Sequence, residues 1–249
     1  MEPTINQTLQ QAINVHQEGK FDEAEKLYKK ILDTEPTNPD ANNNMGVLLV
    51  GAGRFEEAEK YYKKAIELKP DYAEAYSNLS VILNKLNKFD EAIVSCQKAI
   101  EFNPSLAQAY SNLGNAFLKL NRPEDAIVNY NKTIELKPDY VETLYNLGIT
   151  LQKLGRLSEA ESSYKRAIEL KPDYTEAYNN LGIILYELGR LEESILSYRK
   201  AIELKPNYAE AYNNLGNTQK SLRKLDEALT SYNSASAINS DIDYLMGAL

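Results

Sequence analysis

A proline recurs at a fixed interval along this chain, and this period constrains the fold more than any other feature. The prolines that mark it, each 34 positions after the last, are Pro36, Pro70, Pro104, Pro138, Pro172 and Pro206. Ser240 stands in the seventh position. Counting back from each gives seven segments without insertion or deletion: 5–38, 39–72, 73–106, 107–140, 141–174, 175–208 and 209–242. The period predicts a repeat protein, because a segment of this size cannot bury its own apolar face and needs its neighbours.

Each segment has the pattern of two helices. Places are numbered from the first residue of a segment. Leu or Met stands at place 7 in the second to seventh segments, and a large apolar residue stands at place 11 in the second to sixth, which is one helical face. Place 15 is mostly Gly or Asn, which accept the left-handed conformation that ends a helix. An acidic pair or near-pair follows and suits the start of a second helix, as does Pro123. Places 20, 24 and 27 then read small, aromatic, small, as in Ala160, Tyr164 and Ala167. The pattern predicts an all-α protein.

The period and its internal pattern resemble the tetratricopeptide repeat (TPR) family over residues 5–242. The resemblance implies a right-handed α-solenoid of about seven helix-turn-helix units, with the first helices lining a concave groove. The first repeat is more polar than the others, as expected of a cap. Residues 243–249 are interpreted as the start of a following helix or linker, which suggests that the chain is the front part of a longer protein.

Composition excludes several classes of function. The 249 residues include 28 basic and 36 acidic side chains, a net charge of −8, whereas a general binder of nucleic acid or of an acidic membrane needs a basic surplus. No apolar run approaches the ~20 residues of a membrane-spanning helix, and the start does not read as a secretory signal. Cys96 is the single cysteine, so no intrachain disulfide can form. We therefore expect a cytoplasmic protein.

A ladder of asparagines is the main candidate binding site. Place 6, which faces the groove in TPR proteins, holds Asn44, Asn78, Asn112, Asn146, Asn180 and Asn214. With neighbouring first helices ~10 Å apart, one asparagine would meet an extended peptide every two to three residues. A carboxamide can pair with both the C=O and the N–H of a peptide group. The alternative is that these side chains brace neighbouring helices, and the sequence leaves both interpretations open.

Other groove places add less. Tyr145, Asn115 and Asn217 complete the predicted peptide-contact set. Acidic residues at place 2 and lysines at place 13 are interpreted as supporting the helix dipole. The Lys and Arg that co-chaperones of this family use to hold acidic peptide tails are absent from places 2, 5 and 6. That activity is therefore not expected.

Nothing in the sequence predicts catalysis, a metal or a cofactor. His16 is the only histidine and is expected to be exposed, and Cys96 stands at a place where other repeats have a core tyrosine. Repeats spelled "KPDYTEAYNNLG" are similar to the N-terminal superhelix of O-GlcNAc-transferase-like (SPINDLY-like) glycosyltransferases. That resemblance implies a substrate-recruiting arm that holds extended polypeptide, and possible homodimers formed through the convex side. The alternatives are a stand-alone adaptor or the TPR region of another bacterial transferase.

Overall fold

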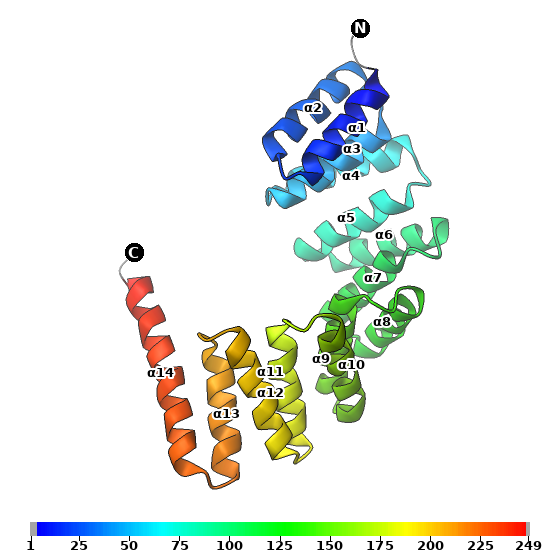
Figure 1. Ribbon diagram of the computed structural model, residues 1–249. Coiled ribbons are helices and arrows are strands. Elements are labelled where there is room, and N and C mark those ends of the chain that lie inside the picture. Colours follow the sequence, from blue (N-terminus) through cyan, green and yellow to red (C-terminus); the bar gives the residue numbers. More distant parts are fainter. Residues whose placement is uncertain (1–3, 248–249) are drawn as a thin grey trace. The chain divides into compact units, whose positions relative to one another are not determined.

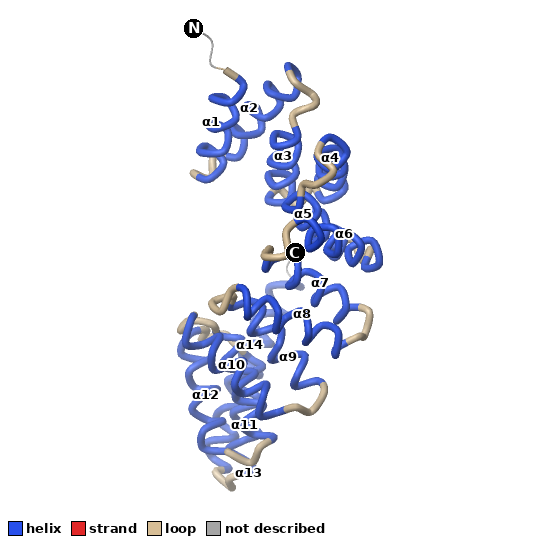
Figure 2. The backbone as a smooth tube through the Cα atoms, turned by 90° about the vertical axis from the view of Figure 1, so that its right-hand side faces the viewer, coloured by secondary structure: helices blue, strands red, loops and turns tan. Residues whose placement is uncertain are grey.

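The computed structural model describes residues 4–247, and every regular element in that range is a helix (Figure 2). Fourteen helices follow one another as seven pairs, in which the odd-numbered helix is the first of its repeat (Figure 1). The first helices are α1 (Ile5–Gln17), α3 (Pro39–Gly51), α5 (Ala73–Lys85), α7 (Ala107–Lys119), α9 (Val141–Lys153), α11 (Thr175–Glu187) and α13 (Ala209–Ser221). The second helices are α2 (Phe21–Thr34), α4 (Phe55–Leu68), α6 (Phe89–Phe102), α8 (Pro123–Leu136), α10 (Leu157–Leu170), α12 (Leu191–Leu204) and α14 (Leu225–Gly247). The predicted all-α solenoid of helix-turn-helix units is confirmed.

The turn inside each repeat depends on place 15. All seven residues there have positive φ: Gly19, Gly53, Asn87, Asn121, Gly155, Gly189 and Arg223. The left-handed conformation is open to glycine, tolerated by asparagine and strained for arginine, whose φ is 61°. The predicted helix ends are confirmed.

The prolines end the second helices through the residue before them. The residue before Pro70, Lys69, has φ −134° and ψ 89°, outside the helical region. The ring of a proline disfavours the helical conformation of the residue that precedes it. Where Ser240 replaces the proline, α14 continues without a break to Gly247, so the helix expected beyond residue 242 is continuous with α14.

A glycine on the first helix and a tyrosine on the second hold the two helices of a repeat close together. A Cβ built on Gly182 at place 8 would lie 2.5 Å from the Tyr198 ring at place 24, and similar distances occur at Gly46, Gly114, Gly148 and Gly216. The third repeat is different, because it has Ser80 at place 8 and Cys96 at place 24. Both side chains are fully buried, which confirms the predicted core position of Cys96.

The helices form two compact bodies, Met1–Leu136 and Lys137–Leu249. In the N-terminal body, the apolar core is continuous across the paired helices and includes Tyr28, Met45, Tyr62 and Leu83. In the C-terminal body, Ile195, Tyr198 and Leu215 form a cluster that joins α12 to α13. In each body the core therefore crosses from one repeat to the next.

Ion pairs join some neighbouring second helices. The acid at place 21 of one repeat contacts the base at place 16 of the next, in the pairs Glu25–Arg54 (3.1 Å), Glu59–Lys88 (2.9 Å) and Glu161–Arg190 (2.7 Å). The same acids also bind the lysine four residues later on their own helix. Place 21 is Ile93, Ile127 and Ile195 in three other repeats, whereas place 16 is Lys or Arg in all seven.

Candidate functional site

Four ladder asparagines join their first helix to the preceding first helix of the same body. In each of them, Nδ2 donates a hydrogen bond to the residue at place 5 of the preceding repeat, 35 positions earlier. The bonds run from Asn78 to Asn43 Oδ1 (3.0 Å), Asn112 to Ser77 O (3.1 Å), Asn180 to Tyr145 Oη (3.2 Å) and Asn214 to Asn179 Oδ1 (3.1 Å). The bracing interpretation of the ladder is thus supported for the donor end of these carboxamides.

The acceptor ends differ along the ladder. No described residue donates a hydrogen bond to Oδ1 of Asn78 or Asn214, and both side chains are half-buried. Asn44 and Asn180 accept only long contacts from their preceding asparagines, at 3.4 and 3.5 Å. Asn146 is half-buried as well. An acceptor on a partly open surface can still take an N–H from a bound chain.

Asn112 is the exception, because the surface is closed around it. Its side chain is 3% exposed; Nδ2 also donates to Ser80 Oγ (3.0 Å), and Oδ1 accepts from Gln108 (2.8 Å). Asn84 on α5 donates to the backbone oxygen of Asn112 (3.1 Å). This pair of first helices, α5 and α7, packs more extensively than the other pairs of first helices within either body. Asn112 therefore presents no free polar atom to a ligand.

The small residues of the third repeat lie beside this closed region. Ser80 hydrogen-bonds the thiol of Cys96, and burial raises the pKa of that thiol to about 12. A thiol with so high a pKa stays protonated and unreactive at neutral pH.

An aromatic cluster covers the first helices at the start of the C-terminal body. The ring of Tyr145 lies 4.7 Å from that of Tyr174 and 5.9 Å from that of Tyr164, between ring centroids. Tyr164 donates its hydroxyl to Gln152 Oε1 (3.0 Å). Burial and, next, the negative charge of Glu176 raise the pKa of Tyr145. Tyr145, predicted from the sequence as a contact residue, is half-buried on this surface.

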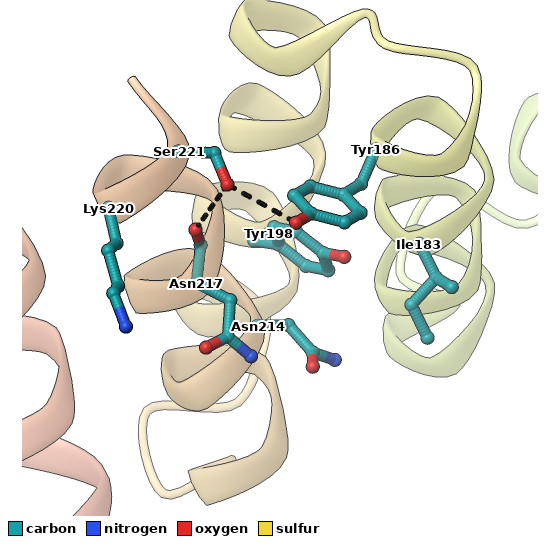
Figure 3. Close-up of a pocket in the computed structure, with 7 residues that line it drawn as sticks. All are labelled: Ile183, Tyr186, Tyr198, Asn214, Asn217, Lys220 and Ser221. Carbon is teal, nitrogen blue, oxygen red and sulfur yellow. Dashed lines mark hydrogen bonds between the residues drawn. The ribbon is translucent and has the colours of Figure 1, made fainter. Parts of the chain in front are cut away.

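A cavity of about 520 Å³ lies between α11 and α13. Figure 3 shows its walls, with Ile183 and Tyr186 on α11, Tyr198 on α12, and Asn214, Asn217, Lys220 and Ser221 on α13. The Tyr186 hydroxyl is 3.2 Å from Ser221 Oγ, which donates to the Asn217 carbonyl (3.1 Å), so the phenol bridges the two first helices (Figure 3). Two residues predicted as contacts, Asn214 and Asn217, thus line one cavity.

The sixth repeat lacks a carboxamide partner for its place-24 tyrosine, Tyr198, which lines the cavity. In three other repeats, the tyrosine hydroxyl donates to a carboxamide at place 9 or 12: Tyr130 to Asn115 (2.8 Å), Tyr164 to Gln152 (3.0 Å) and Tyr232 to Asn217 (2.9 Å). The sixth repeat has Ile183 and Tyr186 at these places. Tyr198, only 2% exposed, interacts with Ser194 of its own helix but makes no hydrogen bond with the other residues that line the cavity (Figure 3).

Charged side chains flank this surface at its two ends. Glu142, Glu176 and Glu210 are exposed in the first turns of α9, α11 and α13. Lys153 and Lys220 are exposed near the other ends of α9 and α13. Glu210 also accepts a hydrogen bond from Asn179 (3.1 Å), which is fully buried and in turn accepts from Asn214.

His16 does not lie where the sequence suggested. It is half-buried rather than exposed, edge-on to the rings of Phe21 and Tyr28 at 5.8 and 6.1 Å, and burial lowers its pKa. Aromatic neighbours one helix away, which the sequence pattern did not assign to it, explain the difference. Across the residues that the structure describes, no group of His, Cys, Asp and Glu could hold a metal ion. Nor does that part contain a helix long and apolar enough to cross a bilayer.

Comparison with known proteins places these repeats. A family profile described as TPR repeat matches residues 81–121, 114–155, 153–189 and 183–223, and profiles described as tetratricopeptide repeat match 15–79 and 209–242. The helical-repeat fold and these matches define the class of protein. The chain belongs to the tetratricopeptide repeat family. No curated protein matches the chain significantly.

Solved structures with similar folds include other TPR proteins. MamA is 25% identical with a TM-score of 0.64, and the match covers 67% of this chain and 97% of MamA. YrrB, described as "a TPR protein with an unusual peptide-binding site", is 24% identical with a TM-score of 0.60, covering 74% of this chain and 95% of YrrB. PilF of Pseudomonas aeruginosa is 17% identical with a TM-score of 0.75, covering 83% and 94%. The YrrB and PilF matches show the fold alone.

Proposed function

We propose that this chain is a non-catalytic scaffold that binds an extended segment of another protein along the first helices of its C-terminal body. The observation that carries the proposal is the cavity between α11 and α13, which opens on the same first-helix surface as the half-buried asparagines. Binding pockets usually combine apolar walls with a few placed polar groups, as this cavity does. The peptide-binding site named for the similar protein YrrB also supports the proposal.

The contact set proposed for the C-terminal body is Asn146, Asn180 and Asn214 together with Tyr145 and Asn217. Since Nδ2 of Asn180 and Asn214 is used within the chain, their Oδ1 atoms are the ends that would accept N–H groups of the ligand. Each such bond contributes ~1 kcal/mol, so affinity needs several together with the cavity. In the N-terminal body, Asn44 and Asn78 keep this proposed role, whereas Asn112 is omitted because it is buried and fully bonded. Asn115 accepts from Tyr130, so only its other atoms could contact a ligand.

The test uses a library of random 12-residue peptides selected on the immobilised protein. Selected peptides should bind Tyr186→Ala about tenfold more weakly, because Tyr186 forms a wall of the cavity and buried aromatic anchors dominate binding energy. The matched control is Leu196→Ala on α12, which removes another exposed large side chain (64% against 39%) outside the cavity. If the two variants bind every selected peptide as the native chain does, the first-helix surface is not the binding site.

We propose the substrate-recruiting arm of an O-GlcNAc-transferase-like enzyme as one setting, and a stand-alone adaptor or an arm of another transferase as the alternatives. Reading the gene beyond the codon for Leu249 tests these directly, since only the first requires a sugar-transferring domain. Pairing of two chains through the second helices and a cytoplasmic location stay predictions.

A further inference from the structure

The acids in the first turns of α9, α11 and α13 differ from several acids on the second helices of the same body. On the second helices, Glu159, Glu161, Glu193 and Glu203 bind lysines or arginines of the chain at 2.5–2.7 Å. Glu142, Glu176 and Glu210 form no ion pair with any described residue. Three carboxylates without an ion pair to any described residue therefore lie in successive first turns, at one edge of the proposed binding surface.

Tyrosine rings lie beside these carboxylates. Tyr145 and Tyr174 pack together, and the charges of Glu142 and Glu176 act on Tyr174. The chain itself shows that such rings hold an ammonium group, since Lys171 Nζ lies 4.9 Å from the centroid of Tyr174. An amine or guanidinium beside an aromatic face and a carboxylate is favourable on both counts. Lys171 and Lys205 occupy faces of Tyr174 and Tyr208, whereas no lysine or arginine lies over the ring of Tyr145 among the described residues.

The cavity has the opposite character. Ile183 and the rings of Tyr186 and Tyr198 form apolar walls around a buried hydroxyl, and Lys220 is the one charged residue among the lining side chains. A positive ligand group is disfavoured there, whereas a large apolar or aromatic side chain fits. The acidic edge would thus bind a basic side chain of a ligand segment, and the cavity would bind an apolar side chain of the same segment.

Helix geometry gives the separation between the regions. Glu176 and Glu210 stand at place 2 of α11 and α13, the two first helices that line the cavity. The cavity residues Ile183, Tyr186, Asn217 and Lys220 stand at places 9 and 12 of these helices, ~10–15 Å further along the helix axis. An extended chain covers that span in about three or four residues. The Tyr198 hydroxyl, almost wholly buried and aimed into the cavity, supplies a polar group for the tip or the backbone of the anchoring residue (Figure 3).

We infer that the segment bound by the C-terminal body carries a lysine or arginine three or four residues from a large apolar side chain. The apolar side chain occupies the cavity, and the basic side chain lies against Glu142, Glu176 or Glu210 and the ring of Tyr145. This inference rests on the proposed function and adds the chemistry of the ligand. The net charge of −8 of the chain acts in the same direction by attracting basic segments.

Three fluorescein-labelled 12-residue peptides on a Ser/Gly background test it by fluorescence anisotropy with the whole chain. The first carries one tryptophan and two arginines three and four residues from it; the second replaces the arginines by glutamates; the third moves the arginines eight residues away. The first should bind at least tenfold more tightly than either of the others in 50 mM salt, and this preference should shrink in 500 mM salt. Equal binding of the three, tighter binding of the glutamate peptide, or no binding by any of them overturns the inference.

A matched pair of triple variants locates the effect. Glu142→Gln, Glu176→Gln and Glu210→Gln together should weaken the first peptide about tenfold and reduce its salt dependence, while the amide oxygen that replaces the Glu210 carboxylate can still accept from Asn179. The control, Glu169→Gln, Asp173→Asn and Glu192→Gln, changes the net charge equally at three other exposed positions in the same body and should leave affinity almost unchanged. Equal losses in both would mean that only net charge matters, which also contradicts the inference. Selection of neutral or acidic peptides that depend on Tyr186 would refute this ligand chemistry and leave the proposed function standing.

Discussion

The close approach of glycine and tyrosine in each repeat can be tested at Gly182. A methyl group there would lie 2.5–2.8 Å from three ring atoms of Tyr198, closer than real Cβ contacts, and the ring is buried among α11, α12 and α13. Forcing an extra methyl into a packed core costs about 1–3 kcal/mol. Replacing glycine by alanine inside a helix returns about 1 kcal/mol. Gly182→Ala should therefore lower the free energy of unfolding by about 0–2 kcal/mol. The first repeat already has an alanine, Ala12, opposite Tyr28, which is consistent with a cost near the low end of this range.

The sign should reverse when the ring is removed. Tyr198→Cys reproduces the residue of the third repeat, where Ser80 and Cys96 share the same space. In that background, Gly182→Ala loses the clash and keeps the helical gain, so it should stabilise the protein by about 1 kcal/mol. The coupling between the two positions is then about 1–3 kcal/mol, as expected for residues in contact.

Urea unfolding followed by circular dichroism measures all four members of this cycle. Because repeat arrays can unfold in parts, the curves are fitted with a nearest-neighbour description of the repeats. Gly51→Ala is the control, since nothing lies within 4 Å of a Cβ at that position, and it should not destabilise. An equal effect of Gly182→Ala in both backgrounds would falsify the steric argument.

Three further predictions concern other parts of the chain. Arg223→Gly should raise the free energy of unfolding by about 0.5–1 kcal/mol in urea titrations, because arginine is strained at φ 61°, and no gain would contradict this. Burial alone would raise the pKa of Glu161, but hydrogen bonds from Lys165 and Arg190 outweigh burial, and the pKa is lowered from its ordinary value of 4.5. The stability that follows from this lowered pKa is present above pH 4.5 and is lost as the pH falls through the lowered pKa. Urea titrations from pH 7 to 3 should show this decrease, and Glu161→Gln should flatten it. Cys96, fully buried with a pKa of about 12, should react with a thiol reagent such as DTNB only as fast as the chain unfolds; a fast reaction in the native state would refute its burial.

Much of the fold could be predicted because its determinants are local. At place 15, Gly and Asn indicate a residue in the left-handed conformation whatever packs around it. Arg223 does not have this preference, and only the 34-residue period assigned it to the same place, where its φ is also positive. The proline before each new repeat acts through the residue just ahead of it in the same way. These features depend on neighbours in the sequence, which a single chain displays.

The roles of the ladder asparagines depend on residues 35 positions away and were therefore open. The overlooked signal was place 5, which from the second repeat onward always carries a side chain with an oxygen: Asn43, Ser77, Ser111, Tyr145, Asn179 and Asn213. Each of these place-5 residues offers a hydrogen-bond acceptor to the ladder asparagine of the next repeat. The cavity was also missed, although the sixth repeat alone combines Ile and Tyr at places 9 and 12. Its volume depends on where the ring of Tyr186 lies, which sequence periodicity cannot give.

The ion pairs between second helices have a consequence for how such an array can change its length. The basic residue at place 16 occurs in every repeat, while its acidic partner at place 21 is replaced by isoleucine in three. A repeat copied or deleted as a whole therefore never leaves a place-21 carboxylate, such as Glu59 or Glu161, facing a neighbour without a base. The exposed guanidinium or ammonium tolerates either neighbour, because it can remain hydrated when no acid is present. In-frame duplication or loss of 34 residues is thus electrostatically safe at any of these junctions, and an ancestor with fewer repeats could have grown one copy at a time.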